Sequence, residues 1–371
     1  MRGKVEADAH PIVPWAATTL HYTEHGGLAQ TGAFAILPPL LLCAKMLPEE
    51  EAMRLGFALQ VLGRPGLKPS DTRRWQSDPH LSVSLAYLRD IFAYLHQVGV
   101  RMYRMSSDLA PYVTHPALPR FHSQIADCTD ELAAVGELAR DDGLRLSLHP
   151  GTHVVLNSPD AAVADRAMIE LCTQASILDH MGLGPEAVIV THAGGVYGDK
   201  RAAMSRLVQR YEQLDEPARR RIVLENDDHS YTLGDIHAIH GQTGVRLVFD
   251  VLHHLCNPTP GMALEKAAHL ALSTWPETQT PKVHYSSPST CVRLIETRIS
   301  SGKRRRLRLP RTPQHADLID PFAFAAFLCT VADARPFDVM LECKGKDLAL
   351  LRLRRQLARL APELVAHLAI T

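Results

Sequence analysis

The sequence predicts an α/β fold, a (β/α)8 TIM barrel with an irregular N-terminal extension. From Arg54 onward, eight short apolar runs alternate with longer amphipathic stretches, which is the pattern of parallel strands joined by crossover helices. Eight strands close a TIM barrel, and residues 54–371 are long enough to form one. No glycine-rich phosphate loop follows an early run, and this disfavours an open doubly wound sheet.

The strand-like runs are short, apolar and rich in Val, Ile and Leu, as strands buried on both faces are. In chain order they cover residues 54–60, 101–107, 144–151, 187–195, 221–227, 246–254, 281–287 and 338–346.

The longer stretches have the apolar spacing of helices that pack one face against a sheet. Gly143, Gly182 and Gly244 stand where we expect the carboxyl-terminal caps of helices, since glycine adopts the left-handed conformation there easily. The clearest stretches cover residues 81–99, 124–143, 160–182, 200–214, 261–275, 320–332 and 347–368.

Residues 1–52 do not follow this alternation. Pro14, Pro38 and Pro39 interrupt the segment, and a glycine-containing stretch lies between them. We therefore expect an irregular or disordered extension over 1–52 and a barrel domain over 53–371.

The charge balance argues against a protein whose whole surface is basic. Lys plus Arg and Asp plus Glu number 40 each, so the formal net charge is +0. Nucleic-acid binders usually carry a positive charge, so that class requires a local basic patch here. Histidine is abundant, with 20 residues, and because imidazole is the commonest metal ligand among side chains, this surplus favours a metal enzyme.

The cysteines indicate a reducing compartment. There are 7 of them, with no C-x-x-C pair, which is typical of a reduced intracellular protein. The uncharged run over 31–44 contains adjacent prolines, is too short to span a membrane and begins too far along the chain for a signal peptide. We expect a cytoplasmic protein that has no membrane partner and works as a monomer.

Acidic and imidazole side chains end most of the strand-like runs. The run "RLVFDVLHH" is the clearest case, because a buried strand there ends in Asp250 and His253. His254 should face away from His253, so we interpret it as a packing residue. The carboxyl ends of all barrel strands converge on one mouth. The polar set is His115, His149, His192, Glu225, Asp250, His253, Lys282, His284, His315 and Glu342.

This set predicts a divalent metal centre. A lone histidine such as His192 or His115 is more often a hydrogen-bonded core residue, so the prediction depends on the set as a whole. Each buried and unpaired charge costs several kcal/mol, so carboxylates gathered at one mouth require cations. The mixture of oxygen and nitrogen ligands suits Zn²⁺, Mn²⁺ or Fe²⁺, and the lack of cysteine argues against a structural zinc site.

These residues lie in motifs that resemble the UV damage endonuclease family, TIM-barrel relatives of endonuclease IV. The resemblance runs from about Arg54 to the last helix, and the motifs follow one another in the same order as in the family. They are "YRMSSDLAPYVTHP", "LSLHPG", "HAGGVYGDK", "LENDD", "FDVLHH", "KVHYSS" and "LECKGK". The resemblance implies a metal-dependent DNA-repair endonuclease that nicks the backbone on the 5′ side of pyrimidine dimers and, as an additional activity, at abasic sites.

The resemblance also implies roles for individual residues. Glu225, Asp250, Lys282 and His115 correspond to catalytic positions, and Lys282 matches a lysine that is carboxylated in some members. The implied cofactor is a cluster of two or three divalent ions, Mn²⁺ first, with Zn²⁺ or Mg²⁺ as alternatives. The implied ligands are His149, His192, Glu225, Asp250, His253, His284, His315 and Glu342.

Contacts with damaged double-stranded DNA are expected from loops at the same mouth. Thr152 and His153 stand where the family has a glutamine and an aromatic residue that push into the duplex, and Phe57 stands where some members have tyrosine. These departures leave the metal chemistry intact but put the lesion preference in doubt. The expected DNA-binding residues are Thr152, His153, Phe57, Tyr197, Lys200, Arg304, Arg305, Arg306, Lys344 and Lys346.

Three other functions fit parts of the pattern. An abasic-site endonuclease of the endonuclease IV type, without photoproduct preference, is compatible with Thr152 and His153. A metal-dependent sugar isomerase also uses His, Asp and Glu in a barrel, but the basic run near Arg305 disfavours it. A non-catalytic DNA-binding relative is disfavoured by the complete set of metal ligands.

Overall fold

The structure is a computed structural model and describes residues 53–299 and 302–368. The expected extension over 1–52 lies outside the described residues. No helix in the described ranges is long and apolar enough to cross a membrane.

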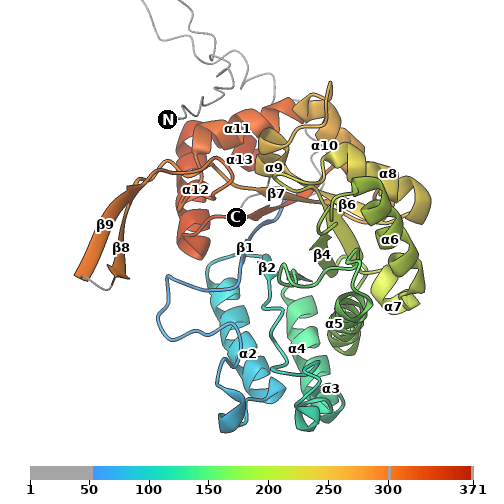
Figure 1. The fold of residues 1–371 in the computed structure, drawn as a ribbon. Coiled ribbons are helices and arrows are strands. Elements are labelled where there is room, and N and C mark those ends of the chain that lie inside the picture. Colours follow the sequence, from blue (N-terminus) through green and yellow to red (C-terminus); the bar gives the residue numbers. More distant parts are fainter. Residues whose placement is uncertain (1–52, 300–301, 369–371) are drawn as a thin grey trace, which may run out of the picture. The chain divides into compact units, whose positions relative to one another are not determined.

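Eight parallel strands close into a barrel that helices surround, as the sequence predicted (Figure 1). Around the barrel the order is β1-β2-β3-β4-β5-β6-β7-β10, and β10 pairs with β1 to close it. Each predicted run contains one barrel strand. The strands are β1 Leu55–Ala58, β2 Met102–Arg104, β3 Arg145–Leu148, β4 Val188–His192, β5 Ile222–Glu225, β6 Arg246–Asp250, β7 Lys282–Tyr285 and β10 Asp338–Leu341.

The helices follow the strands in the expected alternation. They are α2 Leu81–Gln97, α3 Gln124–Asp127, α4 Thr129–Asp141, α5 Ala161–His180, α6 Lys200–Gln213, α7 Glu216–Arg219, α8 Leu233–Thr243, α9 Val251–Cys256, α10 Leu264–Leu272, α11 Pro321–Thr330, α12 Lys346–Leu360 and α13 Pro362–Leu368, with 3₁₀ turns at Trp75–Ser77 and Pro119–Phe121.

Local sequence determines where several helices begin and end. Asp160 caps α5 through the amide nitrogens of Ala162 and Val163, and Thr232 and Asp235 form a capping box at the start of α8. Gly143, Gly182 and Gly244 have φ of 59°, 63° and 71° at or just after helix ends, as predicted.

The sixth strand is shorter than predicted. It ends at Asp250, and residues 251–256 form α9 instead of continuing the strand. The Asp250 side chain accepts a hydrogen bond from the His253 amide nitrogen at 2.7 Å and so begins the helix.

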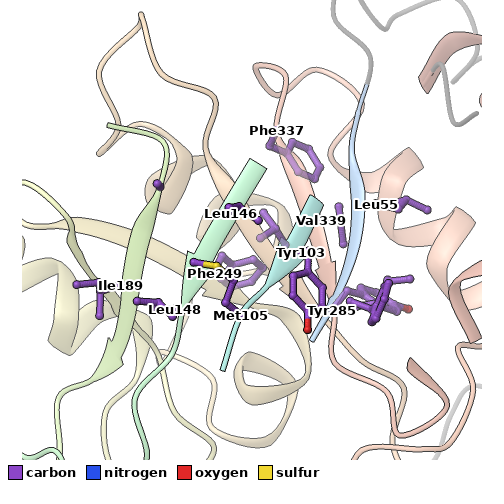
Figure 2. Close-up of a cluster of buried hydrophobic side chains, with 14 of the residues drawn as sticks. Leu55, Tyr103, Met105, Leu146, Leu148, Ile189, Phe249, Tyr285, Phe337 and Val339 are labelled. Atoms are coloured by element: carbon purple, nitrogen blue, oxygen red, sulfur yellow. The ribbon is translucent and has the colours of Figure 1, made fainter. Parts of the chain in front are cut away.

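Side chains alternate between the outside and the inside of the barrel, as they must along strands. The outward residues belong to the largest apolar cluster, and Figure 2 shows Tyr103, Leu146, Leu148 and Val339 among them. The inward residues form smaller clusters. These are Val188, Val190, Val223 and Val248 with Trp275, and Ala58, Met102 and Met340. The lower and middle barrel is therefore packed, and the next inward positions lie at the mouth.

The bottom of the barrel holds a buried ion pair. Arg145 Nη1 lies 2.6 Å from Asp338 Oδ2, and both side chains are 1% exposed. Asp338 Oδ1 also accepts a hydrogen bond from the Arg54 amide nitrogen at 2.8 Å. The protein therefore neutralises this buried acid with its own arginine.

The basic run after β7, which we expected to lie in a loop at the barrel mouth, forms a hairpin. β8 Arg293–Ile299 and β9 Gly302–Arg308 pair antiparallel as a separate two-stranded sheet (Figure 1). The β-branched residues Ile295 and Thr297, alternating with other side chains, favour extended structure in β8.

Candidate metal centre

Strand ends bring the expected ligands to one mouth of the barrel. His192, Glu225 and Asp250 are the last residues of β4, β5 and β6, while His149 and Glu342 directly follow β3 and β10. The remaining ligands come from β7, from the first turn of α9 and from the loop before α11; they are His284, His253 and His315.

Glu225 lies at the centre of four imidazoles. Its side chain is fully buried, and Oε2 lies 3.1 Å from His149 Nε2 and 3.8 Å from His192 Nε2. Oε1 lies 3.0 Å from His284 Nδ1 and 3.5 Å from His253 Nδ1. One carboxylate is therefore shared by ligands from four different parts of the chain.

Asp250 is also fully buried and is fixed by Asn226. The Asp250 amide nitrogen donates to Asn226 Oδ1 at 2.9 Å, and Asn226 Nδ2 donates to the Asp250 carbonyl at 3.0 Å. His253 Nδ1 lies 2.9 Å from the Asn226 carbonyl oxygen. Sequence reasoning missed Asn226; an amide directly after Glu225 in "LENDD" was the available signal.

Glu342 lies between His284 and His315. Its Oε1 lies 3.3 Å from His284 Nδ1, and its Oε2 lies 3.8 Å from His315 Nδ1. Arg104, the last residue of β2, forms an ion pair with it. Arg104 was not among the expected site residues.

The ligand atoms form two overlapping groups. Within each group, one ligand atom per residue lies within 4.8 Å of all the others. Glu225 belongs to both groups, so it could bridge two neighbouring cations. The groups are His149, His192 and Glu225, and Glu225, Asp250, His284 and Glu342.

An unpaired buried carboxylate oxygen fits a bound cation at this centre. Asp250 Oδ2, His192 Nδ1 and His284 Nε2 are buried and have no hydrogen-bond partner among the described residues. Buried polar atoms normally have a partner, because leaving one unsatisfied costs about 1–3 kcal/mol. A divalent ion would satisfy Asp250 Oδ2, and the donor set is one that such ions accept. The unpaired ring nitrogens of His192 and His284 are not the ones that approach Glu225, so they do not bear on this fit.

The surroundings shift the pKa values of the two central acids in opposite directions. Burial raises the pKa of Asp250 well above its ordinary value, and the Glu225 and Glu342 carboxylates add to this although His253 opposes it. For Glu225, burial acts in the same direction, but the His284 and His192 charges and hydrogen bonds from His149 and His284 hold its pKa well below the ordinary value. A bound divalent ion would hold both carboxylates in the ionised form.

Lys282 lies one inward position before His284 and is fully buried. Its Nζ donates to Ser147 Oγ at 2.6 Å. Burial, together with the positive charges of Arg145 and Arg104, lowers the pKa of Lys282 well below its ordinary value. The structure therefore places this expected catalytic residue beneath the cluster, in surroundings that oppose the charge on its amine.

His115 is not brought into the cluster. Its side chain is exposed and lines a cavity of about 700 Å³ together with Tyr112 and His153. Thr152 and His153 are exposed in the loop after β3, where a duplex can reach them.

The other residues expected to contact DNA differ in their exposure and in their partners. Tyr197 is 47% exposed in the loop after β4, while Lys200 pairs with Asp235 at 2.5 Å. Phe57 is 0% exposed and packs edge-on against Tyr103, with ring centroids 5.5 Å apart. A side chain without exposed surface does not contact a duplex, so the expectation for Phe57 does not fit its position.

Two of the expected basic residues line a second cavity. It measures about 560 Å³, and Lys344 and Lys346 line it together with His315 and Glu342 of the metal centre. Arg304, Arg305 and Arg306 are exposed on β9.

Several known proteins are similar to this chain in sequence and in fold. A family model described as UV-endonuclease UvdE matches residues 79–367. The UV DNA damage endonuclease of Bacillus velezensis is 32% identical over 296 residues, which cover 77% of this chain and 85% of that protein. The UV DNA damage endonuclease of Bacillus pumilus is 33% identical over 269 residues, covering 72% and 77%. The crystal structure of SacUVDE superposes with a TM-score of 0.69 at 27% identity and covers 83% of this chain and 99% of that one.

Proposed function

Because this chain belongs to the UV-endonuclease UvdE family, we propose that it is a divalent-metal-dependent endonuclease that nicks duplex DNA on the 5′ side of ultraviolet photoproducts. The observation that carries the metal dependence is the convergence of Glu225, Asp250 and Glu342 with five imidazoles on one barrel mouth. Family membership gives no support to a sugar isomerase.

The proposed ligands include imidazole nitrogens and carboxylate oxygens, a mixture that suits Mn²⁺ and Zn²⁺. When bound, the ions supply a water molecule of lowered pKa as nucleophile and neutralise the charge that develops on the phosphodiester. The residues that would hold them are His149, His192, Glu225, Asp250, His253, His284, His315 and Glu342.

The chain's own residues orient these ligands. Asp250 begins α9 through the His253 amide nitrogen, and so directs the His253 ring toward Glu225. Arg104 holds Glu342 in place and offsets part of its charge. His115 was expected to be catalytic, but it lies away from the cluster, on the cavity that it shares with His153, which supports a role in DNA contact instead.

The test uses three end-labelled duplexes, carrying a pyrimidine dimer, an abasic site or no lesion, each incubated with the protein and Mn²⁺. Incision on the 5′ side of the dimer is the expected result. Incision at the abasic site alone would replace this proposal with the abasic-site endonuclease, which the small Thr152 side chain at the probing position favours. No incision of any duplex would overturn both.

A further inference from the structure

The pairing of β8 with β9 divides the basic run between two faces. In an antiparallel pair, residues directly opposite one another point to the same side. Thr297 lies opposite Arg304 and Ile295 lies opposite Arg306. Side chains alternate along a strand, so Arg304, Arg306 and Arg308, which are two residues apart, share one face of β9. We call this the first face. Lys303 and Arg305 point to the opposite side, the second face.

The two faces differ in charge. On the second face, Glu296 pairs with Lys303 at 2.5 Å and with Arg305 at 2.9 Å. Among the described residues, no ion pair joins a carboxylate to Arg304, Arg306 or Arg308. The first face therefore keeps its full positive charge, while the second face is partly neutralised.

The first face continues into the metal centre. The base of the hairpin lines the 560 Å³ cavity that also opens onto the centre, and Arg308 is the arginine of the first face that reaches it. Lys344 and Lys346 add two more cations to the same wall, and His315 and Glu342 form the end of the cavity at the metal ligands.

We propose that the β8–β9 hairpin is a DNA-binding arm that contacts the phosphate backbone through its first face only, with Arg304, Arg306 and Arg308. The arm positions the strand that runs through the cavity toward Glu342. This inference rests on the proposed function, because it takes DNA as the substrate of the metal centre.

The dimensions of the arm suit a duplex. Alternate residues of a strand lie about 6.8 Å apart, so the first face spreads its arginines over several phosphates of a DNA strand. The hairpin stands out from the barrel (Figure 1), and a two-stranded ribbon is narrow enough for the major groove. Phosphate contacts of this kind fix register without reading sequence, which is what a lesion-directed enzyme requires.

The test compares two double variants that each remove two positive charges from the hairpin. Arg304→Ala with Arg306→Ala removes them from the first face. Arg298→Ala with Lys303→Ala removes them from the second face, where these residues lie opposite each other. Affinity for a fluorescent duplex carrying a pyrimidine dimer is measured by anisotropy between about 50 and 200 mM salt, the range over which phosphate contacts dominate.

The first-face variant should reduce the slope of log affinity against log salt by about 1.8, since each phosphate contact contributes roughly 0.9. Arg308→Ala alone should reduce it by about 0.9. The second-face variant should keep the wild-type slope. Equal slopes for both double variants, whether reduced or unchanged, would overturn the assignment of one face.

Nicking by the wild-type protein, measured on the same duplex, separates this inference from the proposed function. If the wild type nicks beside the dimer and the first-face variant keeps the wild-type salt slope, the DNA-binding role of the hairpin is refuted and the proposed endonuclease activity is supported. If the wild type does not nick and the salt slopes of the two double variants differ as expected, the hairpin is supported as a DNA-binding element and the proposed endonuclease activity is refuted.

Discussion

Single side chains in this protein serve the fold and the proposed chemistry at once. Asp250 uses Oδ1 to begin α9 and leaves the buried Oδ2 for the cluster. Glu225 is shared between two ligand groups and contacts His149 and His284 directly. Loss of either charge therefore acts on several neighbours together.

Glu225→Gln should reduce nicking of a dimer-containing duplex by at least about a hundredfold with the fold intact, as removal of one preorganised charge does in other active sites. Glutamine keeps the shape but removes the charge that two cations would share. Nicking rates and circular dichroism check this. Glu265→Gln, in the exposed group of Glu265, His269 and Asp333, is the matched control and should nick normally. Near-normal turnover in Glu225→Gln would remove the assignment.

His253 and His254 allow a comparison between neighbours. His253 lies 3.5 Å from Glu225, whereas His254 is 3% exposed and packs against Phe249 with ring centroids 5.3 Å apart. His253→Ala should lower the amount of Mn²⁺ bound per chain. His254→Ala should keep that amount but lower the free energy of unfolding by about 1–3 kcal/mol. Metal analysis and urea unfolding measure the two effects, and equal metal content in both variants would contradict the prediction.

The sequence predicts the acids and imidazoles of the cluster better than the residues that support them. His192, Glu225 and Asp250 are conspicuous because a charged or imidazole group ends an otherwise apolar strand. Asn226 and Arg104 have no such signal, since their importance depends on partners that approach only when the barrel closes. The exposure of His115 and the burial of Phe57 also depend on loop and helix packing that local pattern does not encode.

At the scale of secondary-structure elements, close helix packing depends on one glycine. A Cβ atom on Gly136 in α4 would lie 1.7 Å from the Met181 carbonyl oxygen at the end of α5. The two helices approach so closely because glycine has no side chain there. By contrast, a Cβ atom on Gly241 in α8 would meet nothing within 4 Å.

Gly136→Ala and Gly241→Ala should therefore have opposite effects, although both put alanine into a helix. Gly241→Ala should raise the free energy of unfolding by about 0.5–1 kcal/mol, because alanine is the better helix former. Gly136→Ala should lower it by about 1–3 kcal/mol, because the helices must move apart. Urea unfolding measures both. Stabilisation by both substitutions would show that α4 and α5 are not in tight contact.

The elements themselves were largely predictable. The eight barrel strands followed from short apolar runs that alternate with amphipathic stretches, and Gly244 correctly indicated a helix end. The hairpin was missed because a run of arginines has no apolar periodicity, and its strands are held by pairing with each other. Residues 251–254 were taken as strand because Val251 and Leu252 resume the apolar run directly after Asp250.

At the scale of the whole molecule, buried carboxylates have different partners at the two ends of the barrel. At the bottom, Asp338 is neutralised by Arg145. At the mouth, Glu225, Asp250 and Glu342 face imidazoles and Arg104. The barrel closes over packed apolar clusters below this mouth, so we expect the fold to form without ions.

Removal of divalent ions with a chelator should abolish nicking while the circular dichroism spectrum of the barrel is retained. Mn²⁺ added back should restore nicking and raise the free energy of unfolding, by about 2.7 kcal/mol at a free concentration one hundred times the dissociation constant. Undiminished nicking in excess chelator would exclude the proposed metal dependence. Loss of secondary structure on chelation would show that the ions are needed for folding as well.

The order of the ligands along the chain has a consequence for biosynthesis. The ligands follow the order of the strands, from His149 after β3 to Glu342 after β10, and β10 also closes the barrel by pairing with β1. A chain that stops before β10 therefore lacks both the last ligand and the strand that completes the ion-binding cavity. Truncated products that stop short of residue 342 cannot assemble the full set of proposed ligands, so we expect them to be unable to cut DNA.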